Sequence, residues 1–192
     1  MEILKNYALH YEPNPLKLLH TLDFTFECHY MNYEANRTQE RQQEPRPQTV
    51  IGTGGKVLEA LQCLMNQLIG LKRLILRNLF LKTFEASHLL DYVAANCCEN
   101  LQQLTLINCS ERPYAFLHTG IFLNLYRLII SPYHLSEDVL TLLADTKLED
   151  LYLVTDELTK QSDPIDPTVW KRFMRSCKSR VRIHLSMVHH SR

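Results

Sequence analysis

The chain has 192 residues, of which 45% are hydrophobic, and this length and composition suit one domain with a continuous core. Lysine and arginine together number 21, and so do aspartate and glutamate, so the formal net charge is zero. Because binders of nucleic acids or of anionic membrane surfaces carry a basic excess, this balance supports neither function.

The sequence also lacks the marks of export or membrane insertion. No run of about 18 apolar residues occurs, and residues 1–5 do not place a basic segment before an apolar one. The six cysteines fall at irregular spacings, a poor arrangement for a disulfide framework. We therefore expect reduced thiols, with Cys97, Cys98 and Cys109 as core residues, and a cytoplasmic or nuclear location.

One short pattern recurs along the chain: an apolar residue, two variable residues, an apolar residue, one variable residue and a third apolar residue. The copies that begin at residues 71, 101, 125 and 148 are separated by 30, 24 and 23 residues, near the period of leucine-rich repeats. Asn78 and Asn108 stand two residues after the last leucine of their copies, where an asparagine can hydrogen-bond the turn that leaves a strand. The pattern predicts a strand in each copy, beginning at Leu19, Leu71, Leu101, Leu125, Leu148 and, more weakly, Val181.

Segments with helical spacing of apolar residues separate these strands. We predict helices over residues 57–68, 84–96, 136–144 and 168–174. Ser136 is a suitable N-cap, and Asp166 followed by Pro167 is a typical helix start. We predict no regular helix over residues 111–122, because Pro113 and Gly120 interrupt that segment.

Strands that alternate with helices at this period predict an α/β fold. We expect a leucine-rich-repeat solenoid of five or six irregular repeats, with a parallel β-sheet on the concave face and helices on the convex face. Residues 1–192 would form a single domain. Residues 32–49 are polar and contain Pro45 and Pro47, so we predict a flexible insertion there. The 52 residues between the first two copies also leave room for a degenerate repeat.

Residues 52–56, Gly-Thr-Gly-Gly-Lys, are similar to a phosphate-binding loop. That loop requires a glycine at position 50 and a serine or threonine at position 57, and the chain has Val50 and Val57. We interpret the glycines as a turn before a helix.

Metal binding and catalysis find no support in the sequence. No Cys-x-x-Cys pair occurs, the Cys-His pair at position 28 and the His-His pair at position 189 are isolated, and the nucleophile motif Gly-x-Ser-x-Gly is missing. The carboxylate pairs Glu137-Asp138 and Glu149-Asp150 fall at predicted surface positions, which favours a solvated face over acid–base chemistry. We therefore expect no enzyme, no metal site and no cofactor.

The residues between the strand leucines are the candidates for function. Successive side chains of a strand point to opposite faces, so residues between inward-pointing leucines would lie on the concave surface in rows across the sheet. The central row is expected to contain Asp23, Ile75, Thr105, Ile129, Tyr152 and, from the weakest copy, His184. The row before it would contain Thr21, Arg73, Gln103, Arg127, Asp150 and Arg182, and the row after it Thr25, Arg77, Ile107, Ser131 and Val154.

These rows predict a surface for binding another protein. Five of their members would form an exposed apolar strip, and three arginines would flank it, which is typical of protein interfaces. The alternative is that branched residues occur there only because they favour strands. The predicted binding residues are Arg73, Ile75, Arg77, Thr105, Ile107, Arg127, Ile129, Tyr152 and Val154.

The copy Leu-Gln-Gln-Leu-Thr-Leu-Ile-Asn-Cys-Ser at residues 101–110 resembles the repeats of F-box proteins with leucine-rich repeats. Residues 57–81, a helix followed by a strand, look like the region after the F-box in that group. Residues 170–173, Trp-Lys-Arg-Phe, followed by the copy at 181–185, are similar to the late repeats of its members.

The resemblance implies a substrate receptor of a Skp–cullin–F-box ubiquitin ligase, in which the F-box binds the Skp adaptor and the repeats hold the substrate. The chain departs from the family at the F-box itself, because residues 1–15 are too few for its leucine-proline opening and three short helices. The chain would then be part of a longer gene product or a repeat-only relative. The alternative function is a stand-alone scaffold or inhibitor without a ligase.

Overall fold

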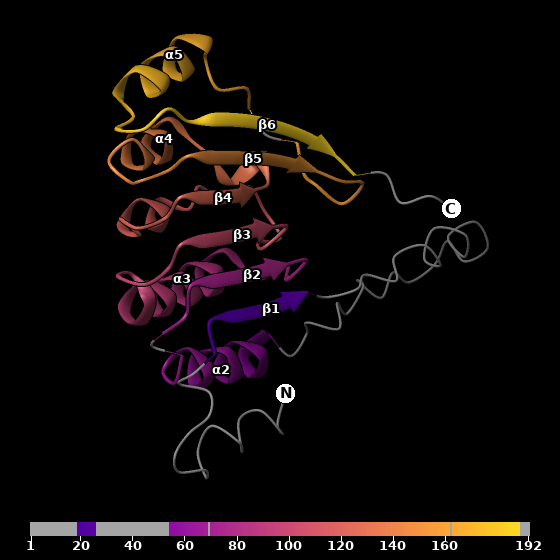
Figure 1. Cartoon of the computed structure of the whole chain (residues 1–192). Coiled ribbons are helices and arrows are strands. Elements are labelled where there is room, and N and C mark those ends of the chain that lie inside the picture. Colours follow the sequence, from indigo (N-terminus) through magenta and orange to yellow (C-terminus); the bar gives the residue numbers. More distant parts are fainter. Residues whose placement is uncertain (1–18, 26–53, 69, 162, 189–192) are drawn as a thin grey trace, which may run out of the picture.

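A computed structural model of the chain describes residues 19–25, 54–68, 70–161 and 163–188 (Figure 1). The insertion predicted at residues 32–49 lies outside these ranges. The described elements, in chain order, are β1 (Thr21–Thr25), α2 (Gly54–Met65), β2 (Arg73–Arg77), α3 (Thr83–Cys97), β3 (Gln103–Ile107), η3 (Leu117–Ile121), β4 (Arg127–Ile130), η4 (Pro132–His134), α4 (Glu137–Leu143), β5 (Asp150–Thr155), α5 (Pro167–Ser176) and β6 (Arg182–Met187), where η marks a 3₁₀ helix.

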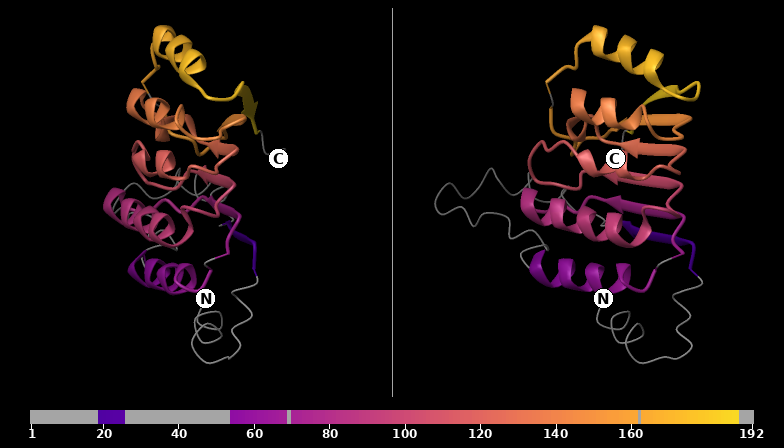
Figure 2. Two further views of the ribbon diagram at one scale, coloured as in Figure 1. Left: turned by 60° about the vertical axis from the view of Figure 1, so that its left-hand side comes forward. Right: turned by 90° about the vertical axis from the view of Figure 1, so that its left-hand side faces the viewer.

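The strands form one sheet in which neighbours in the chain are neighbours in space. All five pairings are parallel, and the order is β1-β2-β3-β4-β5-β6. The helices lie on one side of this sheet (Figures 1 and 2). The predicted α/β class is confirmed, as are the parallel strands stacked in sequence order.

The leucines of the repeated pattern form the core between sheet and helices. Leu74, Leu104, Leu128 and Leu151 occupy paired positions on four adjacent strands, and each is at least 99% buried. Strands β1 to β5 begin two residues after the first apolar residue of their copies, whereas β6 begins directly after Val181. In the copies that start at Leu71, Leu101 and Leu125, this residue closes the turn before the strand. The Leu101 N–H, for example, donates to the carbonyl of Cys97 at the end of α3 (2.9 Å).

Two of the predicted helix starts are confirmed by their caps. Ser136 Oγ accepts a hydrogen bond from the Val139 N–H (3.2 Å), and Asp166 accepts one from the Thr168 N–H (2.6 Å). The glycine turn predicted before α2 is wrong in part, because Gly54 is already the first residue of that helix.

The short helix η3 lies in the segment for which we predicted no regular helix. Gly120 allows η3 to approach α4, since a Cβ at this position would collide with Leu142. Gly120 therefore allows η3 and α4 to pack closely, in addition to interrupting a regular helix.

Asn78 and Asn108 turn the chain where it leaves β2 and β3. Both have a left-handed backbone, with φ of 58° and 49°, a conformation that asparagine adopts more readily than most residues. The prediction placed the hydrogen bonds of Asn108 within its own turn. The structure instead connects its side chain to other turns.

The Asn108 side chain is fully buried and lies at the centre of a polar network. Its amide nitrogen is 3.0 Å from Asn78 Oδ1 and 3.0 Å from both carboxylate oxygens of Asp156. Its amide oxygen accepts hydrogen bonds from the hydroxyls of Thr159 (3.2 Å), Ser131 (3.4 Å) and Tyr133 (3.5 Å). One side chain thus ties together the turns that follow β2, β4 and β5.

A second buried polar residue, His134, packs between Phe116 and Tyr133, whose ring centroids are 4.3 and 4.1 Å away. Its Nε2 accepts a hydrogen bond from the Cys109 N–H (3.2 Å), so Nε2 must be unprotonated. Its Nδ1 lies 2.9 Å from the carbonyl of Tyr114 and must therefore hold the proton. Burial lowers the pKa of this imidazole to about 4, although the bond to Tyr114 opposes the shift.

We predict that Asn108→Gly lowers the free energy of unfolding by about 2–3 kcal/mol, because it removes the side chain but permits the left-handed backbone. The matched control, Asn78→Gly at the equivalent and less buried turn, should cost about 1 kcal/mol. Urea unfolding followed by circular dichroism measures both. An equal or smaller loss in Asn108→Gly would contradict the central role of this side chain.

His134 should make the protein less stable in acid. The imidazole of His134 binds a proton near pH 6.5 in the unfolded chain but only near pH 4 in the folded protein. Its contribution to the free energy of unfolding is therefore fully present above pH 6.5 and is lost as the pH falls from 6.5 to 4. We expect a contribution of up to about 3 kcal/mol. Urea unfolding at several pH values between 4 and 6.5 gives the free energy of unfolding as a function of pH. This free energy should rise less steeply with pH in His134→Gln than in the wild type. The control His88→Gln, at an exposed site, should keep the pH dependence of the wild type. The same pH dependence in all three proteins would refute the prediction.

Candidate protein-binding face

The sheet turns one face away from the helices (Figure 2), and we call it the distal face. The register of the strands places the members of each predicted row side by side on neighbouring strands. The first row runs Thr21, Arg73, Gln103, Arg127, Asp150, Arg182, and the central row runs Asp23, Ile75, Thr105, Ile129, Tyr152, His184. The third row pairs Thr25 with Arg77 and Ile107, and then β4 ends before Ser131.

The exposure predicted for the binding residues is wrong at three positions, two of which belong to the apolar strip. Ile107 is 1% exposed, Thr105 is 5% exposed and Val154 is 8% exposed. Thr105 is a small side chain between Ile75 and Ile129 on the adjacent strands, and these larger neighbours shield it. A ligand approaching this face would meet the larger isoleucines before Thr105.

Three positions of the third row are buried, at Ile107, Ser131 and Val154, and they lie where loops leave the strands. Asn108 follows Ile107 directly, and Asp156 comes two residues after Val154. Since Asp156 is bonded to Asn108, the loop after β5 folds back over the carboxyl end of β3. The accessible part of the distal face is therefore concentrated in the first two rows.

Six predicted binding residues remain at least partly accessible. Arg73 is exposed, and five others are half-buried: Ile75, Arg77, Arg127, Ile129 and Tyr152. The register brings Ile129 next to Tyr152 and Arg127 next to Asp150. Arg73 and Arg77 lie together on β2, on either side of Ile75.

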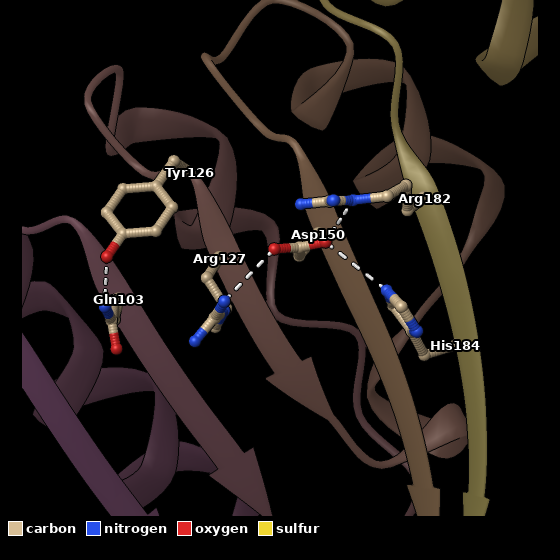
Figure 3. Close-up of polar contacts among 6 residues, drawn as sticks. All are labelled: Gln103, Tyr126, Arg127, Asp150, Arg182 and His184. Carbon is tan, nitrogen blue, oxygen red and sulfur yellow. Dashed lines mark hydrogen bonds and ion pairs between the residues drawn. The ribbon is translucent and has the colours of Figure 1, made fainter.

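A charge cluster around Asp150 occupies the first row and, through His184, the central row of the distal face over β4, β5 and β6 (Figure 3). Arg182 Nε lies 2.8 Å from the carboxylate, Arg127 Nη2 3.2 Å and His184 Nε2 3.3 Å. The Asp150 side chain is only 3% exposed. The prediction of a solvated Glu149-Asp150 pair is therefore wrong for Asp150, although Glu149 is exposed.

The cluster keeps Asp150 ionised. Burial by itself would raise the pKa of this carboxyl, but hydrogen bonds from Arg182, Arg127 and His184 together hold the pKa below its ordinary value. The anion in turn orients three side chains that reach it from both neighbouring strands. Sequence reasoning placed Asp150, Arg182 and His184 in the rows but did not select them as site residues.

The Tyr152 ring is held in place by its neighbours. It stacks on His184 with 4.1 Å between ring centroids and 9° between ring planes. The Arg127 guanidinium carbon lies 5.8 Å from the Tyr152 ring centroid and 5.9 Å from that of Tyr126. Tyr126, whose hydroxyl accepts a hydrogen bond from Gln103, was not predicted (Figure 3). Its position directly before β4 was the signal available in the sequence.

The described cysteines are free thiols. Cys97 and Cys109 are buried, as predicted for core cysteines, whereas Cys98 is half-buried at the end of α3. Burial, reinforced by Cys98, raises the pKa of Cys97 to about 11, and burial raises the pKa of Cys109 further still. These two thiols are therefore kept in their unreactive protonated form.

No protein-family model matches the chain, and no curated protein is significantly similar to it. Across the described residues, no group of three or more histidine, cysteine, aspartate or glutamate side chains is arranged to hold a metal ion. The same part of the chain contains no helix with the length and apolar character needed to span a membrane.

We predict that Asp150→Asn lowers the free energy of unfolding by about 2 kcal/mol, because it removes the anion on which two arginines and a histidine converge. The partly exposed arginines moderate the loss. The control Asp145→Asn, which breaks an exposed pair with Lys178, should change stability by less than about 0.5 kcal/mol. Urea unfolding at pH 7 measures the free energy of unfolding of both variants. Similar losses in the two would contradict a stabilising role for the Asp150 cluster.

Proposed function

We propose that the chain is a leucine-rich-repeat solenoid whose distal face, the concave face of the solenoid, binds another protein. The described strands follow the recurring pattern one to one, and they stack in chain order with a parallel register. Each unit contributes its leucines to a shared core, as in repeat proteins whose units cannot bury an apolar face alone.

The observation that carries the binding function is the composition of the accessible distal face. Ile75, Ile129 and Tyr152 are half-buried apolar or aromatic residues of the central row, and arginines border them in the first row. Protein interfaces are enriched in aromatic residues and arginine. The stack on His184 and the cluster around Asp150 fix Tyr152 and Arg127 before a ligand binds, which lowers the entropic cost of binding.

The resemblance to F-box proteins with leucine-rich repeats suggests which process this binding serves. We propose that the chain is the substrate-binding part of a Skp–cullin–F-box ubiquitin ligase receptor in the cytoplasm or nucleus. Skp adaptor and cullin would be partners only if an F-box is encoded upstream. The alternative is a stand-alone scaffold or inhibitor that binds its partner through the same face without a ligase. Neither function requires a catalytic residue.

The test is quantitative affinity capture from cell extract with the wild-type chain and with the double variant Ile129→Glu/Tyr152→Glu. Both substitutions place a carboxylate on the accessible central row without entering the leucine core. A partner of the distal face should bind the double variant at least about 10-fold more weakly than the wild type. Mass spectrometry identifies the captured proteins, and circular dichroism checks the fold.

The matched control is Leu142→Glu, which introduces the same charge at an exposed apolar residue of α4, on the helix side. Partners of the distal face should bind this variant as they bind the wild type. If the captured proteins bind the wild type, the double variant and Leu142→Glu equally well, the distal face is not the binding surface. Recovery of Skp and cullin would favour the ligase receptor, and a reproducible partner without them would favour the stand-alone scaffold.

A further inference from the structure

The arginines of β2 differ from the other arginines of the distal face, because they have no acidic partner. Arg127 and Arg182 both reach the carboxylate of Asp150, at 3.2 and 2.8 Å. Neither Arg73 nor Arg77 forms an ion pair or a side-chain hydrogen bond within the part of the chain that the structure describes. Arg73 is exposed and Arg77 is half-buried. Two guanidinium groups on one strand are therefore left for a ligand.

The guanidinium group of Arg77 is partly removed from water. Its Nε is buried and has no hydrogen-bond partner among the described residues. A buried donor without an acceptor costs free energy, and Arg77 bears this cost whether or not a ligand is present. A carboxylate that contacts the rest of the guanidinium would meet a charge that is already partly desolvated. Such a pair attracts more strongly than a fully hydrated one.

The strands on either side of β2 compensate this charge only in part. On β1, Asp23 is exposed, lies opposite Ile75 and accepts a hydrogen bond from the Thr25 hydroxyl (2.6 Å). On the other side, the residues of β3 in the same three rows are uncharged: Gln103, Thr105 and Ile107. One carboxylate beside two guanidinium groups leaves this half of the distal face positive, although the formal net charge of the chain is zero.

The spacing along β2 defines which ligand fits. Arg73, Ile75 and Arg77 share the distal face, and the two arginines are about 13 Å apart along the strand with Ile75 halfway between them. An extended ligand segment has the same period, so its residues i, i+2 and i+4 can lie over these three side chains. Complementarity requires acidic residues at i and i+4 and an apolar residue at i+2. Asp23, level with Ile75, would repel an acidic residue at i+2.

We propose that the protein bound by the distal face presents to β2 an extended segment of the form acidic-x-apolar-x-acidic. This inference rests on the proposed function, because it names the chemistry of the ligand of the same face. The acidic residues supply the carboxylates that Arg73 and Arg77 lack, and the apolar residue covers Ile75. A nucleic acid would also supply anions, but its phosphates offer no apolar group for Ile75.

Selection from a random library of ~12-residue peptides, long enough when extended to cover β2, tests the proposal on the full chain. We expect the selected peptides to be enriched in the acidic-x-apolar-x-acidic pattern. Fluorescence anisotropy should show that they bind Arg73→Glu/Arg77→Glu at least about 10-fold more weakly than the wild type. The matched control Lys171→Glu/Arg175→Glu makes the same change of charge at two exposed residues of α5, on the helix side, and should bind them like the wild type.

Exchange of the charges gives a second test that does not depend on a loss of binding. Peptides in which lysine replaces both acidic residues should bind Arg73→Glu/Arg77→Glu more tightly than they bind the wild type, because each like-charge contact becomes an opposite-charge contact. A variant that had merely lost its fold could not show this gain. Lysine peptides that bind the variant no better than the wild type would overturn the proposal.

The uncharged variant Ile75→Ala/Ile129→Ala separates this proposal from the proposed function. Peptides that bind this variant weakly but bind Arg73→Glu/Arg77→Glu as tightly as the wild type would overturn the acidic segment and leave the distal face as the binding surface. Selection of no peptide that depends on either pair of residues would overturn both proposals. Tighter binding of a labelled oligothymidylate than of the selected peptides would overturn the acidic segment in favour of a nucleic acid.

Discussion

The stack of leucines at equivalent positions of neighbouring strands is the constraint on which the rest of the structure depends. Leu74, Leu104, Leu128 and Leu151 are buried by one another and by the helices behind them. A shift of one strand by a single residue would turn its leucines to the distal face and would expose them. The register is therefore fixed by the core, and the distal rows and the turns at the strand ends inherit their alignment from it.

The same register explains why two polar residues can be buried. Asn108 leaves β3 between the turns of its neighbours, so donors and acceptors from those turns surround its amide. Asp150 lies in the first row between Arg127 and Arg182, which are paired with it through the register. A buried amide or carboxylate without partners would be costly, and here the partners come from adjacent strands in either direction. These two networks also tie the later units to one another through directional contacts that leucine packing alone does not provide.

The sequence predicts those features that depend on period and pattern. The strands, the core leucines, the caps at Ser136 and Asp166 and the register of the first two rows all follow from spacing, because each requires only local residues. Burial of Ile107 and Val154 could not be predicted, since it involves the path of irregular loops of different lengths. The Asp150 cluster was missed for a related reason. Its partners are 23 to 34 residues away, and side-chain reach decides which members of a row meet.

The distal face consequently has two halves of different character. Over β4, β5 and β6, the carboxylate of Asp150 compensates the charge of Arg127 and Arg182 and holds the aromatic stack rigid. Over β2, Arg73 and Arg77 flank Ile75, and no ion pair to either arginine is formed among the described residues. A protein ligand that spans both halves would gain shape complementarity from the first and charge complementarity from the second. Because uncompensated surface charge acts at longer range than contact packing, the arginines of β2 would act first as the ligand approaches. The preformed aromatic surface would then determine how long the ligand stays bound.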